Sequence, residues 1–126
     1  MKVNELRIGN WVLYNDLYCK IIGIDESKVL VEYYNGETDY CHIDYIEPIE
    51  LTEEFFLKNG FKKDPMITQY GKEIDEFLIS YIVGVNGCLL SIQGKKSQFY
   101  KYDIKYIHEL QNLYYYLTNE ELEIEL

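Results

Sequence analysis

Several features that mark particular protein classes are scarce or missing in this chain. It has two prolines, no alanine and no run of 18 uninterrupted apolar residues. With 48% apolar and 27% charged residues, this composition excludes a collagen-like rod or a disordered tail and is typical of a globular protein. A length of 126 residues allows one or two small domains and excludes a multidomain enzyme. Because no apolar stretch is long enough for a signal peptide or a membrane span, we expect a soluble, unprocessed, cytoplasmic protein without membrane association.

Metal-ligating side chains are also few. The chain has two histidines and three cysteines, and the odd number and unrelated spacing of Cys19, Cys41 and Cys88 do not form a disulfide framework. Cys41 and His42 are neighbours on a predicted strand, so their side chains point to opposite faces and cannot easily bind one ion. We therefore interpret the cysteines as reduced, small buried hydrophobic residues and expect no metal.

Catalytic motifs are absent as well. There is no Gly-x-Ser-x-Gly elbow, phosphate-binding glycine loop or His-Glu-x-x-His sequence. Carboxylate pairs occur, but Glu53-Glu54 and Glu120-Glu121 stand at predicted helix starts, where capping and solubility explain them. A general acid also needs burial to raise its pKa. The sequence therefore predicts a protein that is not an enzyme and that binds no cofactor.

Positive charge is in short supply. Acidic residues outnumber basic ones 22 to 12, and the net charge of -10 repels phosphate and anionic lipid. Nucleic acid is therefore disfavoured as a partner. Two alternatives stay open: a local patch of lysines that binds nucleic acid directly, or an acidic surface that mimics a phosphate backbone. The candidate patch residues are Lys58, Lys62, Lys63, Lys95, Lys96, Lys101 and Lys105.

Residues 1–51 are predicted to form an SH3-like small β-barrel. Short β-prone runs occupy residues 11–14, 17–24, 29–34 and 38–43, and residues 42–49 read as a terminal turn with a last short strand. Asn35-Gly36 favours a tight hairpin with positive φ at both positions. Alternation places Leu17, Cys19, Ile21, Val29, Val31, Cys41 and Ile43 inside the barrel.

Residues 52–126 are predicted to pack against the barrel as one compact α+β unit. Thr52 caps a short helix that Gly60 closes, and a three- or four-stranded antiparallel meander follows, with strands at residues 61–70, 77–83, 87–93 and 97–102. An amphipathic helix is expected over residues 103–117, with a buried stripe that includes Ile107 and Leu110. The alternation in residues 122–126 predicts an edge strand.

Three separated blocks resemble a family of small uncharacterised proteins from gut Bacteroidetes genomes, their prophages and related phages. The blocks are residues 5–12 (ELRIGNWV), 46–54 (IEPIELTEE) and the pair 106–114 (YIHELQNLY) and 117–122 (LTNEEL). The resemblance implies a mobile-element origin and brings no activity, cofactor or catalytic residue. Family members usually carry glycine where this chain has Asn119, a residue that also tolerates left-handed backbone.

The candidate contact surface is rich in tyrosine. Alternation leaves Tyr18, Tyr34, Tyr40 and His42 facing either outward, as a protein-binding patch, or toward the second segment, as part of a shared core. A polar stripe on the last helix consists of His108, Gln111, Asn112 and Tyr115, and it reads as a solvated face or a contact face. We therefore expect a non-enzymatic accessory or protein-binding module, with a nucleic-acid-associated protein as the alternative.

Overall fold

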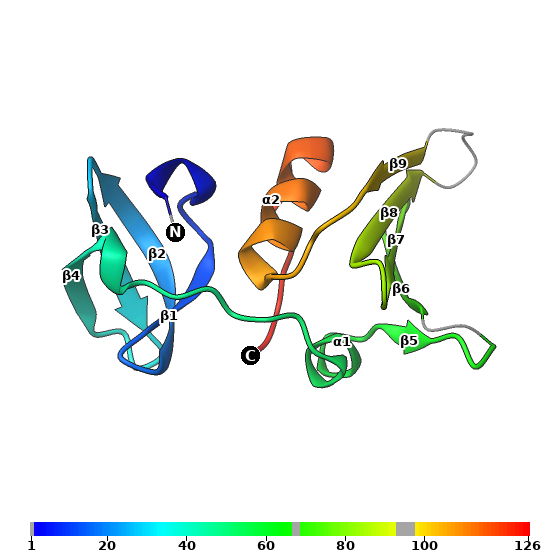
Figure 1. The fold of residues 1–126 in the computed structure, drawn as a ribbon, viewed down its shortest axis with the longest axis horizontal. Coiled ribbons are helices and arrows are strands. Elements are labelled where there is room, and N and C mark those ends of the chain that lie inside the picture. The colour runs from blue at the N-terminus through cyan, green and yellow to red at the C-terminus, as the bar shows by residue number, and fades with distance from the viewer. Residues whose placement is uncertain (1, 67–68, 93–97) are drawn as a thin grey trace. The chain divides into compact units, whose positions relative to one another are not determined.

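The computed structural model describes residues 2–66, 69–92 and 98–126, and its elements are labelled in Figure 1. The fold is α+β, with two antiparallel sheets and a C-terminal helix. The chain divides into two compact units: Met1–Glu50 with Tyr106–Leu122 (unit 1), and Leu51–Lys105 with Glu123–Leu126 (unit 2). One boundary between the units follows Glu50, and the C-terminal helix belongs to the unit of the first sheet.

Unit 1 contains the first sheet, whose strands pair in sequence order. They are β1 (Trp11–Tyr14), β2 (Leu17–Asp25), β3 (Lys28–Tyr33) and β4 (Thr38–His42), and short 3-10 turns η1 (Val3–Glu5) and η2 (Ile43–Tyr45) flank them. The four predicted strands are confirmed to within one residue at each end.

This sheet is open, since no ladder joins β4 to β1 in the part of the chain that the structure describes. The strand pairing therefore shows an antiparallel sheet, and the SH3-like barrel stays a prediction. The chain after η2 nevertheless returns to β1: the Leu13 amide donates to the Glu47 carbonyl at 2.8 Å, and the Glu47 amide donates back at 2.9 Å.

The core of unit 1 contains the predicted inward residues with one exception. Cys19, Ile21, Val29 and Val31 are fully buried, and Cys41 and Ile43 nearly so. Leu17 is 56% exposed, which corrects its assignment to the interior. It is paired with Tyr14 next to the tight β1–β2 turn, where Asn15 and Asp16 both have positive φ, so it lies at the end of the sheet.

The helix α2 (Ile107–Thr118) begins four residues later than the sequence predicts. Asp103 has a φ of 63°, and the Ile104 amide is bonded to the Asn86 carbonyl, so this segment cannot join a helix. Tyr106 is the N-cap, and its amide donates to the Glu109 carboxylate at 3.1 Å. The helix ends at Asn119, whose left-handed φ of 59° is the conformation that the sequence allowed for it.

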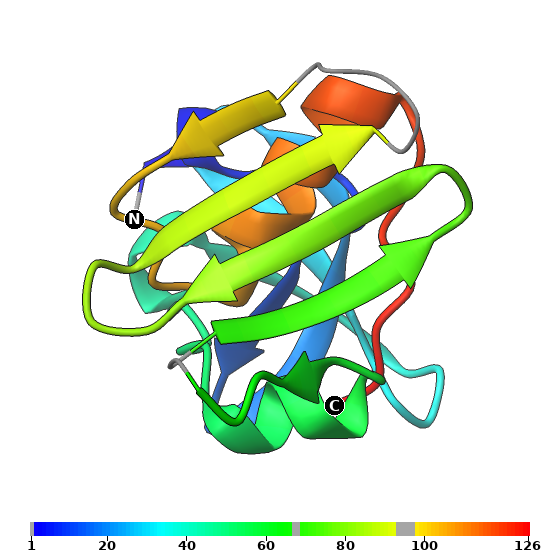
Figure 2. The ribbon, with the colours of Figure 1, turned by 90° about the vertical axis from the view of Figure 1, so that its right-hand side faces the viewer.

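Unit 2 contains a five-stranded meander, seen face-on in Figure 2, one strand more than the largest number predicted. Its strands are β5 (Lys62–Lys63), β6 (Gln69–Ile74), β7 (Phe77–Ile82), β8 (Gly87–Ile92) and β9 (Gln98–Lys101). The run predicted at residues 61–70 becomes two strands, because the chain turns after Asp64. The predicted strand ends at Gln93 and Ser97 lie outside the described residues.

The helix α1 (Glu53–Lys58) has the predicted signals at both ends: Thr52 Oγ1 accepts from the Phe55 amide at 3.1 Å, and Gly60 has a φ of 82°. Its Phe56 side chain is 1% exposed and lies at the centre of an aromatic cluster. The centroids of Phe61, Tyr70 and Tyr81 lie 5.1, 5.2 and 4.7 Å from that of Phe56. This cluster fastens α1 to one face of the second sheet.

The predicted edge strand at residues 122–126 does not form, since that segment pairs with no strand among the described residues. Asn59 takes the place of a strand: its Nδ2 donates to the Glu125 carbonyl at 2.8 Å, and its Oδ1 accepts from the Glu125 amide at 2.6 Å. A side-chain amide thus satisfies the backbone that the alternating pattern assigned to a sheet ladder.

Candidate functional site

The outer face of the first sheet carries two of the predicted contact tyrosines. Tyr18 is 50% exposed and Tyr40 is 52% exposed, while their strand neighbours Cys19 and Cys41 are buried on the opposite face. Leu13 is opposite Tyr18, and Leu30 is opposite Tyr40. Side chains along β2 and β4 therefore alternate between the buried and the exposed face, as predicted, and the rings of Tyr18 and Tyr40 are accessible to solvent.

Charged side chains surround Tyr40. Its hydroxyl donates to Asp25 Oδ2 at 3.1 Å, and Lys28 Nζ lies 5.5 Å from its ring centroid. Partial desolvation and the hydrogen bond to Asp25 raise the pKa of Tyr40, so its hydroxyl stays protonated and able to donate at neutral pH. Lys20 Nζ lies 5.2 Å from the Trp11 ring centroid in the same way.

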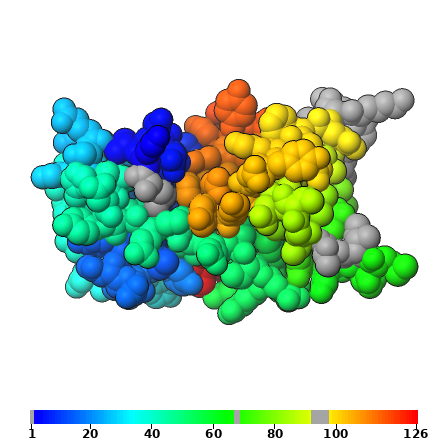
Figure 3. Space-filling view, in the orientation of Figure 1, coloured from blue at the N-terminus to red at the C-terminus, as the bar shows by residue number. Residues whose placement is uncertain are grey.

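Tyr34 stands at the tip of the β3–β4 hairpin and is 98% exposed. The Gly36 amide donates to the Tyr33 carbonyl at 2.9 Å, and the Tyr33 amide donates to the Glu37 carbonyl at 2.8 Å, so the loop has three residues. Only Gly36 has positive φ, which corrects the prediction of positive φ at both Asn35 and Gly36. This turn presents the Tyr34 ring to solvent. The surface of β2–β4, in light blue to turquoise, is visible at the left of Figure 3.

His42 is half-buried at the end of β4, and its ring has a local role. Its Nδ1 accepts from the Asp44 amide at 3.1 Å and caps η2. This hydrogen bond positions the turn that leads the chain back to β1. His42 is therefore a capping residue at the margin of the tyrosine-bearing face.

The centre of the polar stripe on α2, Gln111 and Asn112, is hydrogen-bonded to the segment that enters β1. This corrects the interpretation of the stripe as an exposed face. Gln111 is 2% exposed; its Oε1 accepts from the Trp11 amide at 2.9 Å, and its Nε2 donates to the Gly9 carbonyl at 3.0 Å. Asn112 Oδ1 accepts from Asn10 Nδ2 at 2.7 Å, and Asn112 Nδ2 donates to the Glu5 carbonyl. These bonds join α2 to the segment that enters β1.

The outer part of the stripe is also engaged. The Arg7 guanidinium lies 4.1 Å from the Tyr115 ring centroid and forms an ion pair with Glu121. Asn10, fully buried, is a residue that sequence reasoning missed, and its Oδ1 accepts from the Arg7 amide at 2.7 Å. The opening block and the closing blocks of the family resemblance therefore meet in unit 1, where their polar residues have a structural role.

His108 is also buried, at 2% exposure, so it cannot serve as a surface contact. Among the described residues its Nδ1 has no hydrogen-bond partner, and its ring is stacked on that of Tyr106 at 5.9 Å between centroids. Burial lowers the pKa of His108 below its usual 6.5, and this outweighs Glu109 and Glu5, which act to raise it. His108 is neutral in the folded protein.

We expect the protein to lose stability as the pH falls below about 6.5. As the pH falls, His108 takes up a proton at a higher pH in the unfolded chain than in the folded chain. Its contribution to the free energy of unfolding is therefore complete above pH 6.5 and decreases as the pH falls toward the lower pKa of the folded state. Urea unfolding between pH 7.5 and 5.5 measures this. His108→Gln should flatten this slope relative to the unsubstituted protein, and an unchanged slope would contradict the assignment.

The three cysteines are buried, as predicted. Burial, with nearby Cys41 adding to it, raises the pKa of Cys19 to about 11, and burial raises that of Cys88 to about 12. These thiols are protonated at neutral pH and are therefore weak nucleophiles and metal ligands.

Among residues 2–66, 69–92 and 98–126, no three His, Cys, Asp or Glu side chains are grouped so that they could hold a metal ion. None of the described helices is long and apolar enough to cross a membrane.

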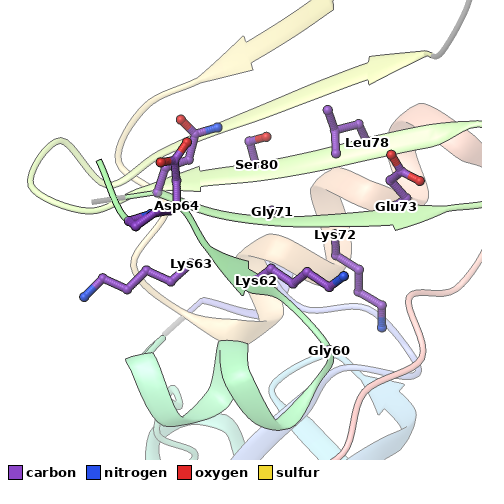
Figure 4. Close-up of a pocket in the computed structure, with 11 residues that line it drawn as sticks. Gly60, Lys62, Lys63, Asp64, Gly71, Lys72, Glu73, Leu78 and Ser80 are labelled. Carbon is purple, nitrogen blue, oxygen red and sulfur yellow. The ribbon is translucent and has the colours of Figure 1, made fainter. Parts of the chain in front are cut away.

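The lysine patch is only partly assembled. Lys62, Lys63 and Lys72 line one hollow beside β5 and β6 in unit 2 (Figure 4), whereas Lys58 Nζ donates to the Leu126 carbonyl at 2.7 Å. Lys95 and Lys96 lie outside the described residues. Charge differs between the units: unit 1 has 13 acidic and 4 basic residues, and unit 2 has 9 acidic and 8 basic residues. Most of the net negative charge therefore resides in unit 1.

No family model, curated protein or solved structure matches this chain. The candidate site accordingly rests on its own geometry.

Proposed function

We propose that this protein is a non-enzymatic accessory module of mobile-element origin that binds another protein through unit 1. The contact face comprises the outer side of β1–β4 and the β3–β4 turn, with Tyr18, Tyr34 and Tyr40 as its aromatic residues. We also propose that unit 1 is a small SH3-like barrel, which the two Leu13–Glu47 hydrogen bonds support.

The near-complete exposure of Tyr34 carries this proposal. A tyrosine presents a large, rigid surface with a polar tip, and such residues are over-represented among those that dominate binding energy. Tyr33, the preceding residue, packs against the core of unit 1, so the hairpin base is anchored while its tip is free to enter a partner's pocket.

The charge of unit 1 indicates a basic surface on the partner. Three exposed acidic residues lie in these hairpins: Asp25 at the end of β2, Glu26 in the turn after it, and Glu37 after the β3–β4 turn. Opposite charges around an aromatic contact speed association and exclude partners of the same sign. We therefore expect binding that weakens as salt is raised.

We expect Tyr34→Ala to abolish capture of the partner while the free energy of unfolding changes by less than about 0.5 kcal/mol, because the ring touches water and not the core. Pull-down from a gut Bacteroidetes lysate with mass spectrometry, paired with urea unfolding, measures both. Tyr116→Ala is the matched control, since Tyr116 is 82% exposed on α2. A partner retained by Tyr34→Ala, or lost equally from both variants, would contradict the proposed face.

A second candidate is association with nucleic-acid metabolism, either through the unit 2 lysines or through acidic unit 1 as a mimic of a phosphate backbone. The excess of 13 acidic over 4 basic residues in unit 1 favours the mimic. A DNA shift assay tests the direct version, because absence of retardation at low salt removes it. If the protein partner proves to be a DNA-binding protein whose DNA competes with unit 1, the mimic is supported.

A further inference from the structure

The hollow beside β5 and β6 has the size and the charge of a small-ligand site (Figure 4). Its volume is about 700 Å³, within the range of pockets that hold small molecules. Its lining includes three lysines, Lys62, Lys63 and Lys72, and two acidic residues, Asp64 and Glu73. The hollow is therefore locally positive in a chain whose net charge is -10.

The Ser80 hydroxyl supplies an independent observation. Ser80 is 3% exposed, and it is one of the residues that line the hollow. It is opposite Gly71 on β6, where a Cβ would lie 3.9 Å from Ser80 Oγ. Because Gly71 has no side chain, a ligand can approach the hydroxyl. A ligand oxygen in the hollow can accept a hydrogen bond from this hydroxyl.

The three lysines differ in what they already bind. Lys72 Nζ donates to the Asn59 carbonyl at 2.6 Å, and Lys63 Nζ lies 3.8 Å from Glu53 Oε1. Of the three, Lys62 is the one whose ammonium forms no ion pair or hydrogen bond within the described part of unit 2. Lys62 is accordingly the cation most available to a ligand.

We propose that this hollow binds the oxyanion of a small ligand, a phosphate or a carboxylate, with Lys62 as its principal cation and Ser80 as a hydroxyl donor. A phosphate or carboxylate oxygen accepts from both groups. The carboxylates of Asp64 and Glu73 repel a polyanion and accept from hydroxyl or ammonium groups elsewhere in the ligand. These features favour a small, singly anionic molecule over a nucleic-acid backbone.

Titration of the ¹⁵N-labelled protein with inorganic phosphate and, separately, with acetate tests the proposal, with ionic strength held constant by sodium chloride. We expect saturable shifts of the Gly71 and Ser80 amide signals with at least one probe; saturation by only one of them identifies the oxyanion. Lys62→Gln should weaken binding about fivefold or more, the loss expected for one charge-assisted hydrogen bond. Ser80→Ala should weaken it as well.

Lys101→Gln is the matched control, because it removes the same charge from β9 of the same unit outside the hollow. Its affinity should match that of the unsubstituted protein. The proposal is overturned if neither probe gives saturable shifts, if Lys62→Gln leaves affinity unchanged, or if Lys101→Gln weakens it equally. These outcomes concern unit 2 and are distinct from the Tyr34 experiment on unit 1.

Discussion

Replacing Phe56 by alanine is expected to unfold unit 2 or to bring it close to unfolding. The Phe56 ring is 1% exposed and contacts the rings of Phe55, Phe61, Tyr70 and Tyr81. Truncating a buried phenylalanine costs about 3–5 kcal/mol, since it removes transfer free energy and leaves a cavity. Because α1 has only six residues, it depends on this packing and cannot persist alone.

Urea unfolding followed by tyrosine fluorescence and far-UV circular dichroism measures the effect. Phe99→Ala is the matched control: Phe99 is 40% exposed on β9, and its loss should cost less than about 1 kcal/mol. If the two variants were equally stable, the aromatic cluster would not be the core of unit 2.

Replacing Gln111 by leucine is expected to have a comparable effect on unit 1. Leucine has similar size and good helix propensity, so the helix itself is not weakened. The change leaves the Trp11 amide and the Gly9 carbonyl without the partners that Gln111 now provides. Each unsatisfied buried group costs about 1–3 kcal/mol, so we expect a loss of about 3 kcal/mol in the free energy of unfolding.

Tyr116→Leu serves as the control for introducing leucine into α2, since that position is exposed and its change should be nearly neutral. Thermal unfolding with the Trp11 fluorescence as reporter follows unit 1 selectively, because Trp11 is the one tryptophan of the chain. An unchanged unfolding midpoint in Gln111→Leu would mean that the hydrogen bonds of Gln111 to Trp11 and Gly9 do not stabilise unit 1.

The strands of unit 1 and the helix α1 could be predicted because their signals are local. Alternation along β2 and β3 identifies Cys19, Ile21 and Val31 as core, and Thr52 with Gly60 marks the two ends of α1. Each of these depends on residues within one turn or one strand. The prediction failed at Leu17. This residue continues the inward alternation of β2, but it lies at the end of the sheet and is exposed.

The candidate site divides in the same way. The exposure of Tyr18, Tyr34 and Tyr40 follows from strand alternation and turn position, both legible in the sequence. The burial of Gln111 on α2 could not be predicted in this way, because a helix face that bears glutamine and asparagine normally faces water. The hollow at Ser80 had no sequence signal, since a serine and a glycine on neighbouring strands form no pattern.

The order of residues alone dictated where strands, turns and short helices form, because those choices depend on near neighbours. Tertiary contact decided which unit α2 joins, and it decided that Gln111 is buried and that Asn112 is partly buried. Their hydrogen-bond partners Gly9, Asn10 and Trp11 stand 100 or more positions earlier in the chain. A polar side chain can leave water cheaply only when such distant groups satisfy it, and periodicity carries no information about them.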